Sequence, residues 1–302
     1  MKTYVVGSGG VGGYLGGLLA KSGKDVTFLA RGEHYHAMVE EGLKVKSVPG
    51  DFEVKPARVI DRISDIANPD LIIFSVKTYD TDQITKELKS VVNKDTIVIS
   101  FQNGVDHDQQ IKNRIPGGNV YPGVAYLASA KTRPGLIEQT GGLRKFIFGD
   151  RHDPDNPRLK EVEKYMREAG ADALASTDIV REIWKKFVFI IAFSGMTSIC
   201  RSPIGRVLGD PIATGLFERC AKEAIKVAQS MGARVEERAF ENIMTNSRNF
   251  PPDSKSSLLV DIENHRRTEI ETLHGSLVRL ARSMKIDVPI NEMIYGTIKL
   301  WS

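Results

Sequence analysis

Short apolar runs alternate with amphipathic segments along the first half of the chain. The runs lack the polar alternation of a half-exposed strand, as is typical of strands that are buried on both faces of a parallel sheet. Segments such as Val11–Ser22 and Thr81–Val92 between them are predicted helices. The order strand, helix, strand indicates a doubly wound α/β sheet. The predicted strands are Thr3–Gly7, Val26–Ala30, Asp70–Val76 and Thr96–Phe101.

The pattern changes after Val120 and again near Ser176. Apolar runs broken at Arg133–Gly135 and at Gly141–Gly142 predict antiparallel hairpins added to the sheet, followed by a helix over Pro157–Ala169 and a last short strand. From Thr177 onward the pattern is helical. We therefore expect an N-terminal Rossmann-type doubly wound sheet domain, residues 1–176, and an all-helical C-terminal domain, residues 177–302. The predicted helices of the second domain are Thr177–Gly195, Pro211–Met231, Glu236–Ser247 and Ser256–Met284.

The composition is that of an ordinary soluble globular protein, with 41% hydrophobic and 26% charged residues. The 42 Lys and Arg residues against 38 Asp and Glu residues give a net charge of +4, and the basic residues are scattered. This distribution argues against nucleic acid or a membrane surface as partner and leaves room for a small anionic ligand. Two cysteines and six histidines show no metal-type spacing, so no metal site is expected. With no signal peptide and no membrane-length apolar stretch, we expect a cytoplasmic protein, either a monomer or a homodimer.

The segment GSGGVG follows the first predicted strand and opens the first predicted helix. In that position Gly7 allows a tight turn, Gly9 lets the backbone approach a pyrophosphate, and Gly12 lets helix and strand pack closely. Phosphates then bind at the helix N-terminus, where free N–H groups face them. The predicted cofactor-binding residues of this loop are Gly7, Ser8, Gly9, Gly10, Val11 and Gly12, and the alternative is a merely glycine-rich turn.

Polar residues follow the other predicted strands at the edge where ligands of open α/β sheets bind. The second strand ends on Arg31 rather than on the acidic residue that an NAD site requires, so NADPH/NADP+ is the expected cofactor. Lys77 and Asn103 follow the next two strands. Taken singly, Arg31 could be a surface charge, Lys77 a helix-entry charge and Asn103 part of a turn.

Two adjacent lysines precede the apolar segment FVFIIAF. Lys185 continues a polar helical stripe, whereas Lys186 lies on a mostly apolar line that becomes polar again at Ser194. Lys186 could be a lysine that extends outward to water from a buried helix. A partly buried lysine beside a carboxylate would instead be a proton donor with a tunable pKa. Glu269, which adjoins the apolar stripe of the last long helix, is the candidate carboxylate, although it could simply pair with Arg266.

Taken together, these residues resemble the ketopantoate reductases (2-dehydropantoate 2-reductases). The resemblance runs along the whole chain and is most specific in SSLLVDIENHRRTEIETLHG, which holds Ser257, Asp261 and Glu269. It implies an oxidoreductase that uses NADPH to reduce 2-dehydropantoate to pantoate, a step of pantothenate and coenzyme A synthesis. It also implies that Lys186 protonates the carbonyl oxygen, that Ser257 and Glu269 hold the 2-oxo acid, and that Asn103 lies beside the reaction centre. Asn103 and Glu269 are thereby also expected beside the cofactor.

The chain departs from the family pattern where specificity is set. Family members place asparagines four and eight residues after the catalytic lysine, where this chain has Ile190 and Ser194. Ser194 is retained as a candidate substrate-binding residue, and Ser254 replaces a further asparagine three residues before Ser257. Because a missing polar partner alters substrate discrimination strongly, reduction of a different 2-oxo acid stays an alternative. A non-catalytic NADP-binding sensor is the third hypothesis.

Overall fold

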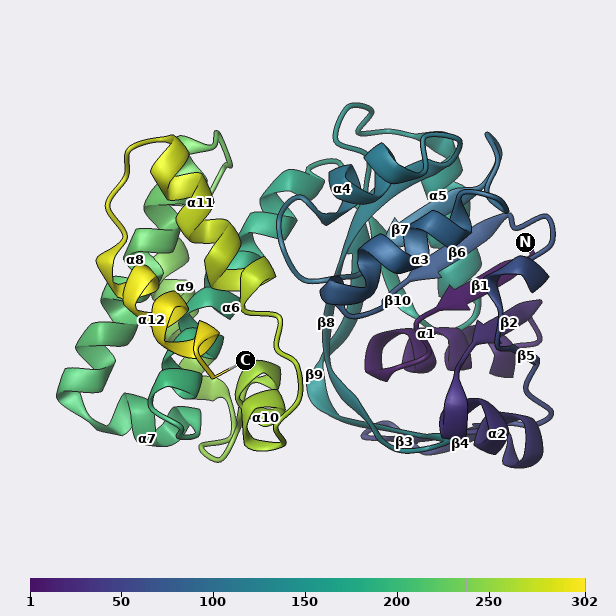
Figure 1. The fold of residues 1–302 in the computed structure, drawn as a ribbon, viewed down its shortest axis with the longest axis horizontal. Helices are drawn as coiled ribbons and strands as arrows, with labels where there is room; N and C mark the ends of the chain where they lie inside the picture. The colour runs from purple at the N-terminus through teal and green to yellow at the C-terminus, as the bar shows by residue number, and fades with distance from the viewer. Residues whose placement is uncertain (237, 302) are drawn as a thin grey trace. The chain divides into compact units, whose positions relative to one another are not determined.

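The computed structural model describes residues 1–236 and 238–301, which form two compact units. Unit 1 contains Met1–Gln102 and Asp106–Ile179, and unit 2 contains Asn103–Val105 together with the chain from Val180 onward. Figure 1 shows that unit 1 is built from a sheet and helices, while unit 2 is built from helices. The predicted fold class, an α/β domain followed by a helical one, is confirmed.

Unit 1 is organised around a ten-stranded sheet with the order β4-β3-β9-β8-β7-β6-β1-β2-β5, and β10 pairs with β9. In the part of the sheet ordered β8-β7-β6-β1-β2-β5, all neighbouring strands are parallel. Strand β1 has β2 on one side and β6 on the other. The chain therefore reverses its direction of travel across the sheet at β1, which is where open α/β sheets bind ligands. The strands are β1 (Thr3–Val6), β2 (Val26–Leu29), β3 (Leu43–Ser47), β4 (Phe52–Val54), β5 (Val59–Ile60), β6 (Leu71–Phe74), β7 (Ile97–Ser100), β8 (Asn119–Arg133), β9 (Leu136–Phe148) and β10 (Asp172–Ala175).

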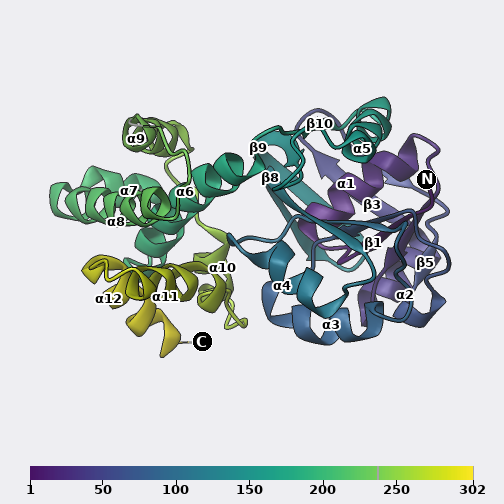
Figure 2. The ribbon, with the colours of Figure 1, turned by 90° about the horizontal axis from the view of Figure 1, so that it is seen from above.

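Helices cover both faces of this sheet, as Figure 2 shows. Alternate side chains of the central strands β1, β2, β6 and β7 enter opposite cores: Val5 packs in the core that holds residues of α1 (Gly10–Lys21) and α5 (Pro157–Glu168). Its neighbour Val6 packs in the core that holds residues of α3 (Thr81–Leu88) and α4 (His107–Arg114). Burial on both faces explains why these strands lack polar alternation.

The β8–β9 hairpin turns at Pro134–Gly135, as predicted, and Gly135 has φ +71°. The predicted break at Gly141–Gly142 is wrong, because both residues lie inside β9. The pairing register of β9 with β8 shifts around Tyr126–Ser129, and Gly142 has φ +80°. A bulge therefore accommodates the two glycines without ending the strand.

Unit 2 contains seven α-helices within the described residues. The predicted helix over Ser256–Met284 is wrong, since α10 ends at Glu263 and a π-helix over Glu271–Gly275, η3, leads into α11. The predicted segment Glu236–Ser247 includes position 237, which lies outside the described residues. The α-helices are α6 (Ile179–Ile199), α7 (Ile204–Gly209), α8 (Pro211–Ser230), α9 (Ala239–Asn249), α10 (Ser257–Glu263), α11 (Ser276–Ser283) and α12 (Pro289–Lys299).

A Schellman motif ends α10. His265 adopts a left-handed conformation with φ +51°, its N–H donates to the carbonyl of Ile262, and the N–H of Arg266 donates to the carbonyl of Asp261. This pair of bonds normally marks a helix end with glycine at the left-handed position. The absence of glycine here explains why the apolar periodicity alone suggested one continuous helix.

Candidate active site

The glycine loop between β1 and α1 has the geometry that a dinucleotide requires. Gly7 has φ +103°, and a Cβ atom there would lie 2.5 Å from the backbone nitrogen of Val76. A Cβ atom at Gly12 would lie 2.2 Å from the carbonyl oxygen of Gly7, whereas one at Gly9 would meet no atom within 4 Å. Gly7 and Gly12 thus need to be glycine for the fold itself. Gly9, which has open space beside it, is the position at which a pyrophosphate approaches the backbone.

The other three loop residues serve mainly to hold the loop in place. The Ser8 hydroxyl donates to the carbonyl of Leu29 over 2.9 Å, and a Cβ atom at Gly10 would lie 2.3 Å from the carbonyl oxygen of Ser129. Val11 packs against the core of unit 1. These residues can contact phosphates through their backbone N–H groups near the start of α1.

Arg31 follows β2 and lies at the N-cap of α2 (Gly32–Glu41). Its side chain is 49% exposed, and its Nη2 lies 3.7 Å from Glu87 Oε2. An exposed ion pair of that length is weak, so the guanidinium is available to a phosphate group. Lys77 is partly buried and lies at the N-cap of the short helix η2 (Thr78–Asp80) that follows β6.

Gln102 links the ends of β6 and β7, a role that the sequence did not reveal. Its side-chain nitrogen donates to the carbonyl of Val76 over 3.0 Å and to the Thr81 hydroxyl over 2.8 Å. Gly104, two residues on, has φ +117°. The backbone around Asn103 is therefore fixed by the buried side-chain amide of Gln102 before it and by the conformation of Gly104, which favours glycine, after it.

Lys186 meets two of the predicted partners within unit 2. Lys185 is exposed, whereas Lys186 is partly buried and its Nζ donates to Asn103 Oδ1 over 3.1 Å. Burial lowers the pKa of Lys186 from its ordinary value near 10.5 to about 8, although the negative charge of Glu269 acts in the opposite direction. Lys186 can therefore be charged and still release a proton near neutral pH.

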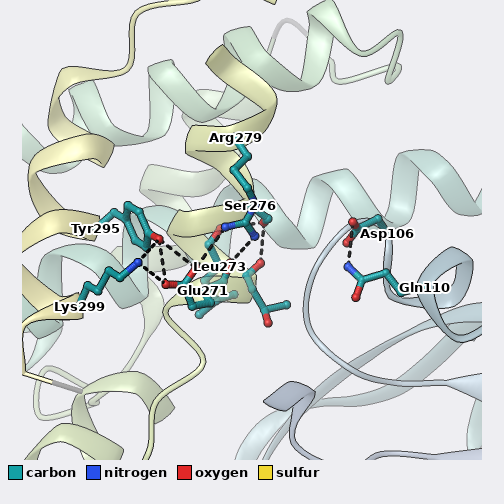
Figure 3. A network of polar contacts seen from close by, with 9 residues as sticks. Asp106, Gln110, Glu271, Leu273, Ser276, Arg279, Tyr295 and Lys299 are labelled. Carbon is teal, nitrogen blue, oxygen red and sulfur yellow. Dashed lines mark hydrogen bonds and ion pairs between the residues drawn. The ribbon is translucent and has the colours of Figure 1, made fainter. Parts of the chain in front are cut away.

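Glu269 lies in the segment between α10 and η3 and is only 8% exposed. Figure 3 shows the contacts that fix the helix beginning two residues later. Glu271 accepts hydrogen bonds from the hydroxyl of Tyr295 over 2.8 Å and from Arg279 over 3.1 Å, and it pairs with Lys299 over 3.0 Å. This network ties η3 to α11 and α12, so the backbone that carries Glu269 is held at its C-terminal end.

The two candidate serines differ in their surroundings. Ser194 is buried, and its hydroxyl donates to the carbonyl of Ile190 over 2.6 Å, so its proton is used within α6. Ser257 is exposed on the first turn of α10. The N-cap of α10 is its neighbour Ser256, which accepts from the N–H of Leu259 over 3.1 Å, so the Ser257 side chain is not the cap.

Three aromatic rings lie together beside the lysine-bearing face of α6. Phe189 and Phe193 follow Lys186 by three and seven residues and therefore share its face. Their ring centroids lie 5.7 Å and 5.2 Å from that of Phe250. Together with the partly buried Ile190, these side chains make the surroundings of this face apolar.

Lys186, Asn103 and Glu269 are thus the three predicted residues that the structure brings together. In residues 1–236 and 238–301, no group of three or more His, Cys, Asp or Glu side chains could hold a metal ion. Across the same residues, no helix is long and apolar enough to span a membrane. The arrangement is suited to proton donation by an amine in a partly apolar environment.

Two family models match nearly the whole chain. The model described as ketopantoate reductase PanE/ApbA matches residues 3–153, and the model of the C-terminal part of the same enzymes matches residues 178–301.

Curated relatives span the chain from end to end. The uncharacterized oxidoreductase YkpB of Bacillus subtilis is 29% identical over 100% of this chain and 99% of its own length. A 2-dehydropantoate 2-reductase of Pyrococcus horikoshii is 27% identical over 99% of this chain and 97% of its own.

Solved structures have the same fold. The crystal structure of 2-dehydropantoate 2-reductase from Geobacter metallireducens superposes with a TM-score of 0.93, at 25% identity and 100% coverage of both chains. A D-mandelate dehydrogenase solved with NADH and anilino(oxo)acetate superposes with a TM-score of 0.88, at 22% identity, and the match covers 100% of this chain and 98% of that one.

Proposed function

The chain belongs to the ketopantoate reductase family of oxidoreductases, and from this premise we propose that it reduces 2-dehydropantoate to pantoate with NADPH. The reaction would supply pantoate for pantothenate and coenzyme A synthesis. In this proposal residues 1–176 bind the cofactor and residues 177–302 bind the 2-oxo acid and carry the proton donor.

The observation that carries the proposal is the environment of Lys186. Its amine donates a hydrogen bond to Asn103. Burial lowers the pKa of this amine to about 8, while the negative charge of Glu269 favours its protonated form. A purely NADP-binding sensor has no need of a proton donor. The sensor hypothesis is therefore less favoured than catalysis.

The chain's own residues account for the second half of a carbonyl reduction. NADPH, when bound, supplies the hydride to the carbonyl carbon. As negative charge develops on the carbonyl oxygen, the Lys186 ammonium stabilises it and then transfers a proton to it. Asn103 orients the ammonium by accepting one of its hydrogen bonds, and Glu269 favours the charged form before transfer. Ser257 and Glu269 are proposed to hold polar groups of the 2-oxo acid.

The cofactor proposal depends on Arg31 and the glycine loop. Arg31 is an exposed cation at the end of β2, and the first acidic residue after that strand is Glu33. A cation at this position favours the 2′-phosphate of NADPH over the free 2′-hydroxyl of NADH.

The proposal is tested by following NADPH oxidation with 2-dehydropantoate and a panel of other 2-oxo acids. Lys186→Ala is compared with Lys185→Ala, the exposed neighbour on the same helix. We expect the first variant to lose about a hundredfold or more in kcat and the second to stay close to wild type. Tight NADPH binding without turnover of any 2-oxo acid would favour the sensor.

A second substrate class is favoured by the apolar surroundings of Lys186. The hydroxyl group of 2-dehydropantoate needs a polar partner, whereas Ile190 offers none and Ser194 donates its proton to the helix backbone. Phe189, Phe193 and Phe250 would accommodate a bulky apolar or aromatic side chain instead. Ile190→Asn separates the two substrate classes. If the apolar class is the natural one, the ratio of kcat/KM for 2-dehydropantoate to kcat/KM for an aromatic 2-oxo acid should be higher in this variant than in the wild type.

A further inference from the structure

His34 joins two segments of unit 1 that lie far apart in the sequence. It belongs to α2, and its side chain is only 6% exposed. Its Nδ1 accepts a hydrogen bond from the backbone N–H of Gly135, at the turn of the β8–β9 hairpin, over 2.9 Å. Its Nε2 lies 2.9 Å from the carbonyl oxygen of Ser8 in the glycine loop.

These two partners require one particular form of the imidazole. A backbone N–H can only donate, so Nδ1 must be unprotonated, and a carbonyl can only accept, so Nε2 must carry the hydrogen. One neutral tautomer satisfies both contacts. Burial, the largest influence, lowers the pKa of His34 and so supports this neutral form, although the hydrogen bond to Ser8 opposes the shift.

The contact with Ser8 controls the direction of the next N–H group. The carbonyl of Ser8 and the N–H of Gly9 belong to one planar trans peptide and therefore point in opposite directions. When His34 holds the Ser8 oxygen, the Gly9 N–H points away from His34. Gly9 immediately precedes α1, and its Cα side is open, with no atom within 4 Å of a Cβ position. An N–H group at a helix start is a typical anion ligand.

We propose that His34 is a positioning residue for the dinucleotide, because it holds the Ser8–Gly9 peptide in the orientation that presents an N–H group to the pyrophosphate. The proposal rests on the proposed binding of NADPH. Gly9 is the open position of this loop and has no side chain to restrain it, so a hydrogen bond that fixes the Ser8–Gly9 peptide plane has an effect here that it lacks at a packed position. The helix that carries His34 also begins directly after Arg31, so one helix restrains both predicted phosphate contacts.

Two substitutions separate the two contacts of His34. In His34→Asn the side-chain oxygen takes the place of Nδ1, so the variant retains an acceptor for Gly135 and loses the donor to Ser8. In His34→Gln the amide nitrogen takes the place of Nε2, so the variant retains the donor to Ser8 and loses the acceptor. The affinity for NADPH, from fluorescence titration, and the unfolding temperature are measured for both variants and for the wild type.

We expect His34→Asn to bind NADPH about tenfold more weakly than the wild type, since the peptide loses one restraining hydrogen bond. His34→Gln should stay within about threefold of the wild type. A role confined to stability would lower the unfolding temperature without separating the two affinities. Equal affinities in the two variants would therefore overturn this inference alone, whereas failure of the wild type to bind NADPH would overturn the proposed function as well.

Discussion

The pH dependence of catalysis tests whether Lys186 donates the proton. The pKa of Lys186 is lowered to about 8, and only the protonated amine can serve as donor. Its protonated fraction falls from about 90% one pH unit below that pKa to about 10% one unit above it. The rate of 2-oxo acid reduction, measured as kcat/KM, should therefore fall about tenfold between about pH 7 and 9 and continue to fall at higher pH.

Glu269→Gln is the perturbation that identifies the titrating group. The charge of Glu269 favours the protonated form of Lys186, so its removal leaves the lowering by burial unopposed. The alkaline limb of the profile should then move to lower pH, whatever the loss in absolute rate from weaker substrate binding. A matched control is Glu263→Gln, which removes an exposed carboxylate that pairs with Lys255.

The assay is the initial rate of NADPH oxidation from about pH 6 to 10 in buffers of constant ionic strength, so that screening stays fixed. The reasoning fails if the wild-type rate is flat across this range. It also fails if Glu269→Gln shifts the limb to higher pH, or if Glu263→Gln shifts it as much as Glu269→Gln does.

Three further predictions concern the cofactor loop, cofactor choice and acid stability. Gly9→Ala should weaken NADPH binding at an unchanged unfolding temperature, while Gly12→Ala, whose Cβ would lie 2.2 Å from a carbonyl oxygen, should destabilise the fold by about 2 kcal/mol in denaturant titrations. Arg31→Ala should weaken NADPH about tenfold or more and NADH little in the same binding titration; equal weakening would refute the 2′-phosphate assignment. Burial lowers the pKa of His274 to about 4. As pH drops, His274 is therefore protonated in the unfolded chain before it is protonated in the folded protein. The free energy of unfolding should fall by about 2–3 kcal/mol as pH drops from about 6.5 to 4. In denaturant titrations across this range His274→Leu should flatten the dependence, and an unchanged slope would exclude His274 as its cause.

Local rules allowed the sequence to predict much of unit 1. Buried parallel strands and the turn at Gly7 each follow from a few adjacent residues, and the structure has both. The strands β4 and β5 escaped prediction because they have only three and two residues, and β3 escaped it because lysines interrupt its apolar residues and its burial is only partial.

Other features were harder to predict, either because a residue adopts a conformation unusual for its type or because the contact joins segments far apart in the sequence. The end of α10 depends on a left-handed His265, a conformation that sequence patterns assign to glycine. Asn103 follows a strand of unit 1 in sequence but groups with the helices, where Lys186 contacts it. His34 gave no sequence signal, since its two partners lie 26 and 101 residues away.

The most direct test of the proposed reaction is the fate of the hydride. The wild-type protein is incubated with NADPH that carries deuterium at both C4 positions of the nicotinamide, together with 2-dehydropantoate or the best substrate of the 2-oxo acid panel. We predict a 2-hydroxy acid with a single deuterium at C2, detected by mass spectrometry and NMR, and about a hundredfold less of it with Lys186→Ala. A product without deuterium at C2, or equal product from the variant, would contradict the proposed reduction with Lys186 as proton donor.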